Sequence, residues 1–191
     1  MIELADVRLA GDPGAFYPDV LGVEDGRIGV SHLAFSGEGA AFYHFAFLVP
    51  GDRFAAAEAW AGERVELLAT IDFPAWDARA CYFHDPAGNI VELIAHREIG
   101  AAGRTGPFAA GELLAVSELG VPGADADELE ARGLPAWDRF DPLVFCGRKG
   151  HTLIVTPVGR GWIPTGRPAE AHPAEVVVRG LGAELRLRFG G

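Results

Sequence analysis

The chain has 191 residues, 49% of them hydrophobic, and a formal net charge of −11. Such a chain can bury the core of one large domain or two small ones, whereas its 16 scattered basic residues argue against a nucleic-acid-binding protein, because phosphate binding needs a basic face. No apolar run approaches the ~20 residues that span a bilayer, and the N-terminal sequence lacks a signal pattern. We therefore expect a cytoplasmic protein with no membrane partner.

The first part of the chain predicts alternating strands and short helices. Loose alternation predicts a strand over residues 2–9, and the GDPG turn leads into a short amphipathic helix at 15–21. Further strand is expected at 27–35 and, after an SGEG turn, at the aromatic-rich segment 41–49. The sequence PGD then starts a helix over 53–61.

Three predicted strands follow this helix, at 66–71, 78–83 and 90–95. The hairpin between the last two is closed by DPAGN, in which proline presets φ while Gly88 and Asn89 tolerate positive φ. From residue 41 onward the order is therefore β, α, β, β, β.

The sequence also repeats itself, and the repeat is more informative than any single element. FPAWD at 73–77 recurs as LPAWD at 134–138. YFHDPAGNIVELI at 82–94 aligns without a gap on VFCGRKGHTLIVT at 144–156. These matches predict that the βαβββ pattern occurs more than once.

We accordingly predict one diverged βαβββ unit at about 1–40, a clear one at 41–97 and a third at 111–157. The tail supplies two strand-like segments without a helix, at 175–179 and 183–189, so a fourth unit is truncated.

This arrangement predicts a first domain of paired units at 1–98, a Gly/Ala/Arg-rich linker at 99–110 and a degenerate second domain at 111–191. The Pro/Gly-rich stretch 156–173 is expected to be a long loop.

One carboxylate, Glu92, lies in the middle of the apolar strand predicted at 90–95. Burying an ionised carboxylate without a partner costs several kcal/mol. Glu92 must therefore face water, pair with a cation or bind a metal ion, and the residues alone leave these three options open.

The strand HFAFLVP, the helix after it and the closing FHDPAGNIVEL together resemble the vicinal oxygen chelate superfamily, which includes glyoxalase I, bleomycin and fosfomycin resistance proteins and extradiol dioxygenases. The helical AFYPDVLG at 15–22 is similar to the first unit of that family. The resemblance implies an α+β fold in which repeated βαβββ units form cupped, mixed β-sheets flanked by helices.

The resemblance also implies a divalent metal in the cup. The family's metal-binding His and Glu correspond to His44 and Glu92 in this sequence. One nitrogen and one oxygen donor suit Fe, Mn, Zn, Ni or Co.

The family uses three or four ligands, and the first unit does not supply a matching one, because Leu4 stands at that position. His32 is our candidate for the third ligand, the alternative being a hydrogen-bonded histidine on a half-exposed strand. Glu3 and Asp6 would serve only after a register shift, and we favour reading them as solvated carboxylates.

The third unit carries aliphatic residues at both ligand positions, Val116 and Ile154. We therefore expect its cup to bind no metal in the same way. Its own polar residues, Glu118, His151 and Cys146, are interpreted as structural.

Other side chains are candidates for roles around the cup. His96 shares strand parity with Glu92, and we consider His96 and Tyr82 as general acid or base groups beside Glu92, the alternative for His96 being a rim residue in water. Trp76 and Trp137 occupy matching places and favour packing. Cys81, like Cys146, is expected to be a small buried thiol.

Together these features favour a metal-dependent enzyme acting on a small substrate with two adjacent oxygens, either an isomerase or lyase or a ring-cleaving dioxygenase. The alternatives are a metal-free protein that binds and sequesters a small molecule, and a regulatory protein in which His44 and Glu92 form only a buried hydrogen bond. No motif implies a nucleotide cofactor. A homodimer is a further possibility, and the resemblance implies that a second copy could supply the missing ligand in trans.

Overall fold

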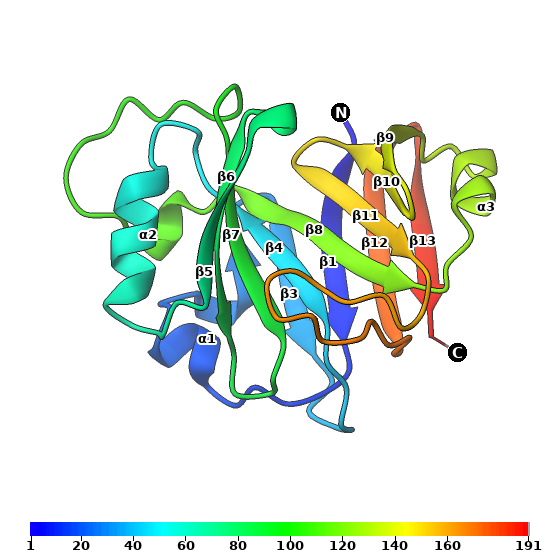
Figure 1. The fold of residues 1–191 in the computed structure, drawn as a ribbon, viewed down its shortest axis with the longest axis horizontal. Helices are drawn as coiled ribbons and strands as arrows, with labels where there is room; N and C mark the ends of the chain where they lie inside the picture. The colour runs from blue at the N-terminus through cyan, green and yellow to red at the C-terminus, as the bar shows by residue number, and fades with distance from the viewer. Residues whose placement is uncertain (191) are drawn as a thin grey trace.

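The computed structural model describes residues 1–190 and has an α+β fold with two β-sheets (Figure 1). The smaller sheet has five strands in the order β13-β12-β1-β3-β2. Its strands are β1 (Glu3–Leu9), β2 (Arg27–Ile28), β3 (Ser31–Phe35), β12 (Ala174–Leu181) and β13 (Ala183–Phe189).

The larger sheet has eight strands in the order β5-β6-β7-β4-β8-β11-β10-β9. Its strands are β4 (His44–Leu48), β5 (Ala69–Phe73), β6 (Ala78–His84), β7 (Ile90–His96), β8 (Ala115–Pro122), β9 (Ala136–Phe140), β10 (Leu143–Arg148) and β11 (His151–Thr156).

The helices are short, as the sequence predicts. The α-helices are α1 (Phe16–Asp19), α2 (Phe54–Gly62) and α3 (Ala126–Ala131), and single turns of 3-10 helix occur at Glu24–Gly26, Pro74–Trp76 and Ala110–Glu112.

The strand expected at 27–35 is interrupted by a turn. Gly29 has a φ of +54°, and a Cβ there would lie 1.9 Å from the carbonyl oxygen of Leu114. The close approach of the two backbones therefore requires glycine and divides the segment into β2 and β3.

The main hydrophobic core lies between the two sheets. Phe45 and Phe47 of β4 are fully buried there, together with Leu4 and Val7 of β1. Helix α2 adds Ala57 to the same core. Because successive side chains of a strand point to opposite faces, His44 and Ala46 point to the other face of the larger sheet.

That other face is curved into a cup. Trp76, from the turn between β5 and β6, contacts Trp137 of β9 with ring centroids 6.2 Å apart, and its indole N–H donates to Asp138 at 2.5 Å. Since β5 and β9 are the two edges of the sheet, this contact requires the sheet to curl. Both tryptophans are packing residues, as the sequence predicts.

The pairing of the repeated units differs from our expectation. The clear unit (β4 to β7) joins the third unit (β8 to β11) through antiparallel pairing of β4 with β8. The diverged first unit instead joins the C-terminal strands through pairing of β1 with β12. The predicted boundary at 98/99 therefore falls between two halves of one sheet. The sequence repeat identifies the units, but it does not show which strands of different units pair with each other.

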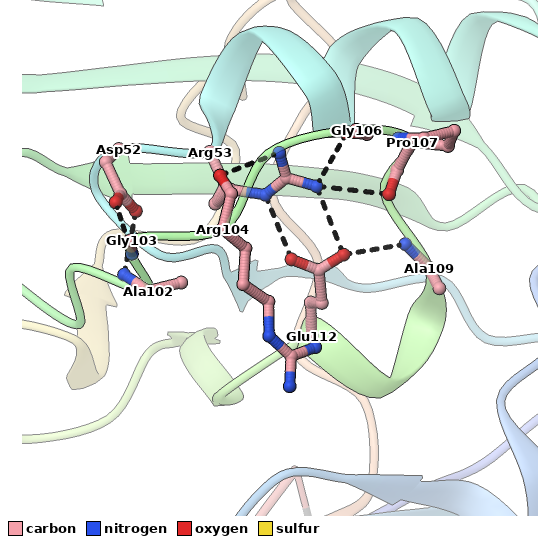
Figure 2. Close-up of polar contacts among 9 residues, drawn as sticks. All are labelled: Asp52, Arg53, Ala102, Gly103, Arg104, Gly106, Pro107, Ala109 and Glu112. Carbon is pink, nitrogen blue, oxygen red and sulfur yellow. Dashed lines mark hydrogen bonds and ion pairs between the residues drawn. The ribbon is translucent and has the colours of Figure 1, made fainter.

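The predicted linker 99–110 is tied to the N-terminus of α2 (Figure 2). The buried guanidinium of Arg53 donates to both carboxylate oxygens of Glu112, at 2.9 and 3.2 Å, and to the carbonyl oxygens of Gly106 and Pro107. Asp52 accepts two further bonds from linker amides. The segment is thus an ordered part of the fold.

Within residues 1–190, no helix is long and apolar enough to cross a membrane.

Candidate metal centre

Three neighbouring strands of the larger sheet place two carboxylates on the same face of the sheet, one on either side of a small residue. Ala46 in β4 is paired with Glu92 of β7 on one side and with Glu118 of β8 on the other. Because directly paired residues point to the same face of a sheet, both carboxylates project into the cup. Alanine between them leaves room for the two side chains to approach.

His44 lies two residues before Ala46 and faces the same way. Its Nε2 is 3.3 Å from Oε2 of Glu92, and both side chains are almost fully buried, at 7% and 4% exposure. Its other ring nitrogen, Nδ1, is 3.3 Å from the carbonyl oxygen of Ile90. The sequence-based prediction that His44 and Glu92 lie together is thus consistent with the geometry.

This contact to Ile90 fixes the chemistry of the histidine. A carbonyl oxygen can only accept, so Nδ1 must carry the proton. In the neutral ring, Nε2 of His44 then presents a lone pair to the carboxylate of Glu92, and two acceptors face each other. A cation between them, either a proton or a metal ion, removes this conflict, and a carbonyl-oriented imidazole is a common arrangement for a metal ligand.

Glu118 is the residue that sequence reasoning missed. It is 5% exposed, and burial, followed by the negative charge of Glu92, raises the pKa of its carboxyl well above the ordinary value. No basic side chain forms an ion pair with Glu118 within the part of the chain that the structure describes. Our interpretation of Glu118 as a structural residue did not anticipate that it faces the same cup as His44 and Glu92.

A β-bulge explains the error. Phe47 pairs with Val116 while the preceding Ala46 pairs with Glu118, so Ser117 is an extra residue in β8. Val116 consequently packs in the core between the sheets, and Glu118 faces the cup. Our sequence analysis placed Val116 at the position of His44, but the bulge turns the Val116 side chain to the opposite face of the sheet.

Tyr82 completes the group. It pairs with Glu92 across β6 and β7, and its ring stacks on His44 with centroids 6.2 Å apart. Burial, and then the charges of Glu92 and Glu118, raise the pKa of Tyr82 far above its usual value. Tyr82 therefore keeps its proton and can donate a hydrogen bond, but it cannot act as a base near neutral pH.

His32 is not brought to this group. It lies on β3 of the five-stranded sheet, is 41% exposed and has Nδ1 3.4 Å from Asp6. Its neighbour Leu33 points into the core, so His32 points away from it. Glu3 and Asp6, our alternative ligands, both lie on β1 of the same five-stranded sheet. They are therefore not on the sheet that carries His44 and Glu92.

His96 is buried, but at a distance from Glu92. It follows Glu92 by four residues on the same strand, which corresponds to roughly 13 Å at the usual rise per residue. It is fully buried, so our alternative of a rim residue in water is wrong. Burial, and then the charge of Lys149, lower the pKa of His96 to about 4.

The remaining predicted packing residues have structural surroundings. Cys81 and Cys146 are buried free thiols, as expected, and burial raises their pKa values to about 12 and about 11. His151 accepts a hydrogen bond at its Nδ1 from the backbone N–H of Leu4 and so links β11 to β1.

The donor set can be tested for its fit to a metal ion. The separation of 3.3 Å between His44 Nε2 and Glu92 Oε2 suits two ligands that each lie about 2.0–2.2 Å from one ion. Across residues 1–190, however, no group of three or more His, Cys, Asp or Glu side chains is already arranged to hold one. Two donors therefore fit as they stand, and Glu118 is the nearest further carboxylate on the same face.

A groove lies elsewhere on the molecule. It has a volume of about 960 Å³ and is lined by the ends of β1, β3, β12 and β13 together with α3. His44, Glu92, Glu118 and Tyr82 do not line it.

Comparison with known proteins gives matches at the level of structure only. No family model and no curated protein matches the sequence. A putative dioxygenase from Bacillus subtilis superposes with a TM-score of 0.56 at 15% identity, with 87% of this chain and 66% of that chain covered. This chain thus spans just under two thirds of that protein.

Two further solved structures are similar over different lengths. Glyoxalase I from Zea mays has a TM-score of 0.48 at 12% identity, covering 99% of this chain and 72% of the other. Lactoylglutathione lyase from Agrobacterium tumefaciens has a TM-score of 0.39 at 22% identity, covering 50% and 95%.

Proposed function

We propose that this chain, whose fold is similar to that of a putative dioxygenase, is a divalent-metal-dependent enzyme acting on a small substrate with two adjacent oxygens. His44, Glu92 and Glu118 would hold the metal ion. The observation that carries the proposal is the buried contact of 3.3 Å between Nε2 of His44 and the carboxylate of Glu92, with Nδ1 of His44 turned to the carbonyl oxygen of Ile90. That arrangement needs a cation, and no lysine or arginine forms an ion pair with Glu92 in the part of the chain that the structure describes.

The electrostatics of Glu118 support its place as the third ligand. Burial, and then repulsion from the nearby carboxylate of Glu92, raise the pKa of Glu118. A divalent ion would offset this cost for both groups. All three ligands come from one chain, so the site needs no ligand from a second subunit, and the homodimer remains a separate prediction.

The other residues of the cup have their own tasks in this proposal. Tyr82, which keeps its proton, would donate a hydrogen bond to a substrate oxygen or to Glu92. The Tyr82 ring, which stacks on His44, forms an apolar wall with Ala46 and Ile94 that would exclude water. When bound, the metal ion would act as a Lewis acid on two adjacent oxygens. Isomerase or lyase chemistry and ring-cleaving dioxygenase chemistry are both compatible with this arrangement.

The experiment is metal analysis of tag-free protein, treated with a chelator and then supplied with Zn, Mn, Fe, Ni or Co. We expect stoichiometric binding of at least one of these metals. His44→Ala, Glu92→Gln and Glu118→Gln should each weaken binding by more than the roughly 10- to 100-fold that loss of an outer partner costs.

His32→Ala is the matched control, because it removes a histidine that lies on the other sheet. It should leave metal affinity unchanged. If His32→Ala abolishes binding and Glu118→Gln does not, the proposed ligand set is wrong.

A second candidate function is metal-free binding of a small molecule. It is favoured by a specific observation: the cup is filled with apolar and aromatic side chains, among them Phe42, Phe145 and Trp162. Native protein that binds none of the five metals, yet retains affinity for a small aromatic molecule, would support this alternative.

A further inference from the structure

The long loop between β11 and β12 lies across the cup. In Figure 1 it is the orange segment that crosses in front of β4 and β8. Residues 157–170, here called the arm, fold back on themselves through backbone hydrogen bonds. Gly159 N–H donates to Ala169 O at 2.7 Å, and Trp162 N–H donates to Arg167 O at 2.9 Å. The arm is therefore an ordered unit attached to the sheets at its two ends.

The arm inserts one side chain into the cup. Trp162 is 4% exposed and packs in the hydrophobic cluster of the cup. Its ring lies 4.9 Å from the ring of His44, centroid to centroid. The indole thus covers the histidine that we propose as a metal ligand.

Strand β8, which is paired with β4, leaves room for this indole at Gly120. A Cβ on Gly120 of β8 would lie 2.6 Å from two atoms of the Trp162 ring. Gly120 has no positive φ to explain it, so the space it leaves is the reason for glycine here. The indole therefore fills a space, here called the slot, that is bounded by His44 of β4 and by Gly120 of β8.

Few contacts hold the arm closed apart from Trp162 and the buried Ala169. Arg167 stacks on the ring of Phe42 at 3.3 Å and donates through Nη1 to the carbonyl oxygen of Gly88 at 3.1 Å. The Arg167 side chain is exposed and makes no contact with His44 or the carboxylates. It is an anchor on the rim.

We propose that the arm is a displaceable plug, in which the Trp162 indole holds the slot that a neutral aromatic ring of the ligand takes when the arm opens. The proposal rests on the proposed function, because it names the ligand class of the same site. The ligand ring is neutral because the two arginines near the slot, Arg160 over the Trp162 ring and Arg167 over the Phe42 ring, both belong to the arm and leave with it.

A plug of this kind has a quantitative consequence. Ligand binds only the open form, so its apparent dissociation constant equals the intrinsic one divided by the open fraction. Loosening the closed arm at a point remote from the slot must therefore tighten binding. Arg167→Ala removes one hydrogen bond and one cation–π contact, which corresponds to roughly a fivefold to twentyfold rise in the open fraction.

The test uses indole as the probe and chelator-treated full-length protein, so that its outcome does not depend on metal binding. Calorimetry gives the indole affinity, and NMR relaxation dispersion of the Trp162 side chain gives the fraction of molecules in which the arm is open. Arg167→Ala should raise this open fraction and tighten indole binding by the same factor. Trp162→Ala, which removes the competing ring, should bind indole more tightly than the native protein.

Arg64→Ala is the matched control. Arg64 also stacks on an aromatic ring and donates to a backbone carbonyl, both of Trp60, but on α2 outside the cup. It should change neither the open fraction of the arm nor the indole affinity.

The proposal is overturned if Arg167→Ala opens the arm without tightening indole binding, or if neither Arg167→Ala nor Trp162→Ala takes up indole. Loss of metal binding in the variants of the preceding subsection has no bearing on these measurements, so the two proposals fail separately.

Discussion

His96 shows how a single buried side chain can couple stability to pH. Neither of its ring nitrogens has a hydrogen-bond partner within residues 1–190, and its pKa is lowered to about 4. In an unfolded chain the histidine pKa is about 6.5. Between these values the unfolded chain binds a proton that the native protein does not, so stability is full above pH 6.5 and falls as the pH drops toward 4.

We predict that His96→Leu removes part of this pH dependence. At pH 7.5 the variant should be as stable as the native protein or slightly more stable, because an unpaired polar group is replaced by an apolar one. At pH 5 it should gain about 2 kcal/mol relative to the native protein. Urea unfolding at the two pH values measures the free energy of unfolding of both proteins. If this free energy falls by the same amount from pH 7.5 to pH 5 in the native protein and in the variant, the prediction is contradicted.

The direction of a side chain could be predicted from the sequence where side chains alternate without interruption along a strand. It could not be predicted where a β-bulge interrupts this alternation. His44 and Glu92 could be placed together because no bulge interrupts the pairing of β4 with β7. Glu118 could not, because one extra residue in β8 reverses parity, and nothing in VSELGVPG marks a bulge. The useful signal was the isolated carboxylate of Glu118 in an apolar strand, which is the same signal that singled out Glu92.

At the scale of elements, the segment 99–110 is held by one buried ion pair. Arg53 and Glu112 have side-chain exposures of 5% and 7%, and the arginine also bonds linker carbonyls (Figure 2). Removing one member leaves the other as an unpaired buried charge. We predict that Arg53→Met lowers the free energy of unfolding by about 3–5 kcal/mol.

The double variant Arg53→Met/Glu112→Leu is the matching control. It removes both charges and should recover much of the loss, because no charge is left unpaired. Denaturant unfolding of the native protein, the single variants Arg53→Met and Glu112→Leu, and the double variant gives the coupling energy between the two side chains. Simple additivity of the two single changes would contradict a direct ion pair.

Most elements could be predicted from hydrophobic period and turn residues. The strand expected at 90–95 and the helix expected at 53–61 each lie within one residue of β7 and α2. The loop 156–173 was also expected, but its arm was not. Only the three-dimensional structure shows that Trp162 returns to the cup, since the sequence around it contains no repeat partner and no periodicity.

At the scale of the whole molecule, the two middle units share one sheet, and the first unit depends on the C-terminal strands. β1 is hydrogen-bonded on both sides, to β12 and β3. The sequence could not predict this pairing, because all five residues of β4 are buried and the strand pattern does not reveal which edge meets which partner.

We therefore predict that the fragment 1–98 does not fold alone. It would leave the edge of β4 that meets β8, and the edge of β1 that meets β12, without partners. Thermal unfolding followed by circular dichroism should show no cooperative transition for the fragment and a cooperative one for the full chain. A cooperative transition in the fragment would support an independent first domain instead.

The account depends above all on His44, Glu92 and Glu118 sharing one cation. The most direct measurement is an anomalous-difference map from crystals grown with Mn²⁺ or Zn²⁺. We predict a single strong peak about 2.0–2.2 Å from Nε2 of His44 and from a carboxylate oxygen of each glutamate. An empty cup in protein saturated with metal, or a peak at His32 and Asp6 in its place, would contradict the account.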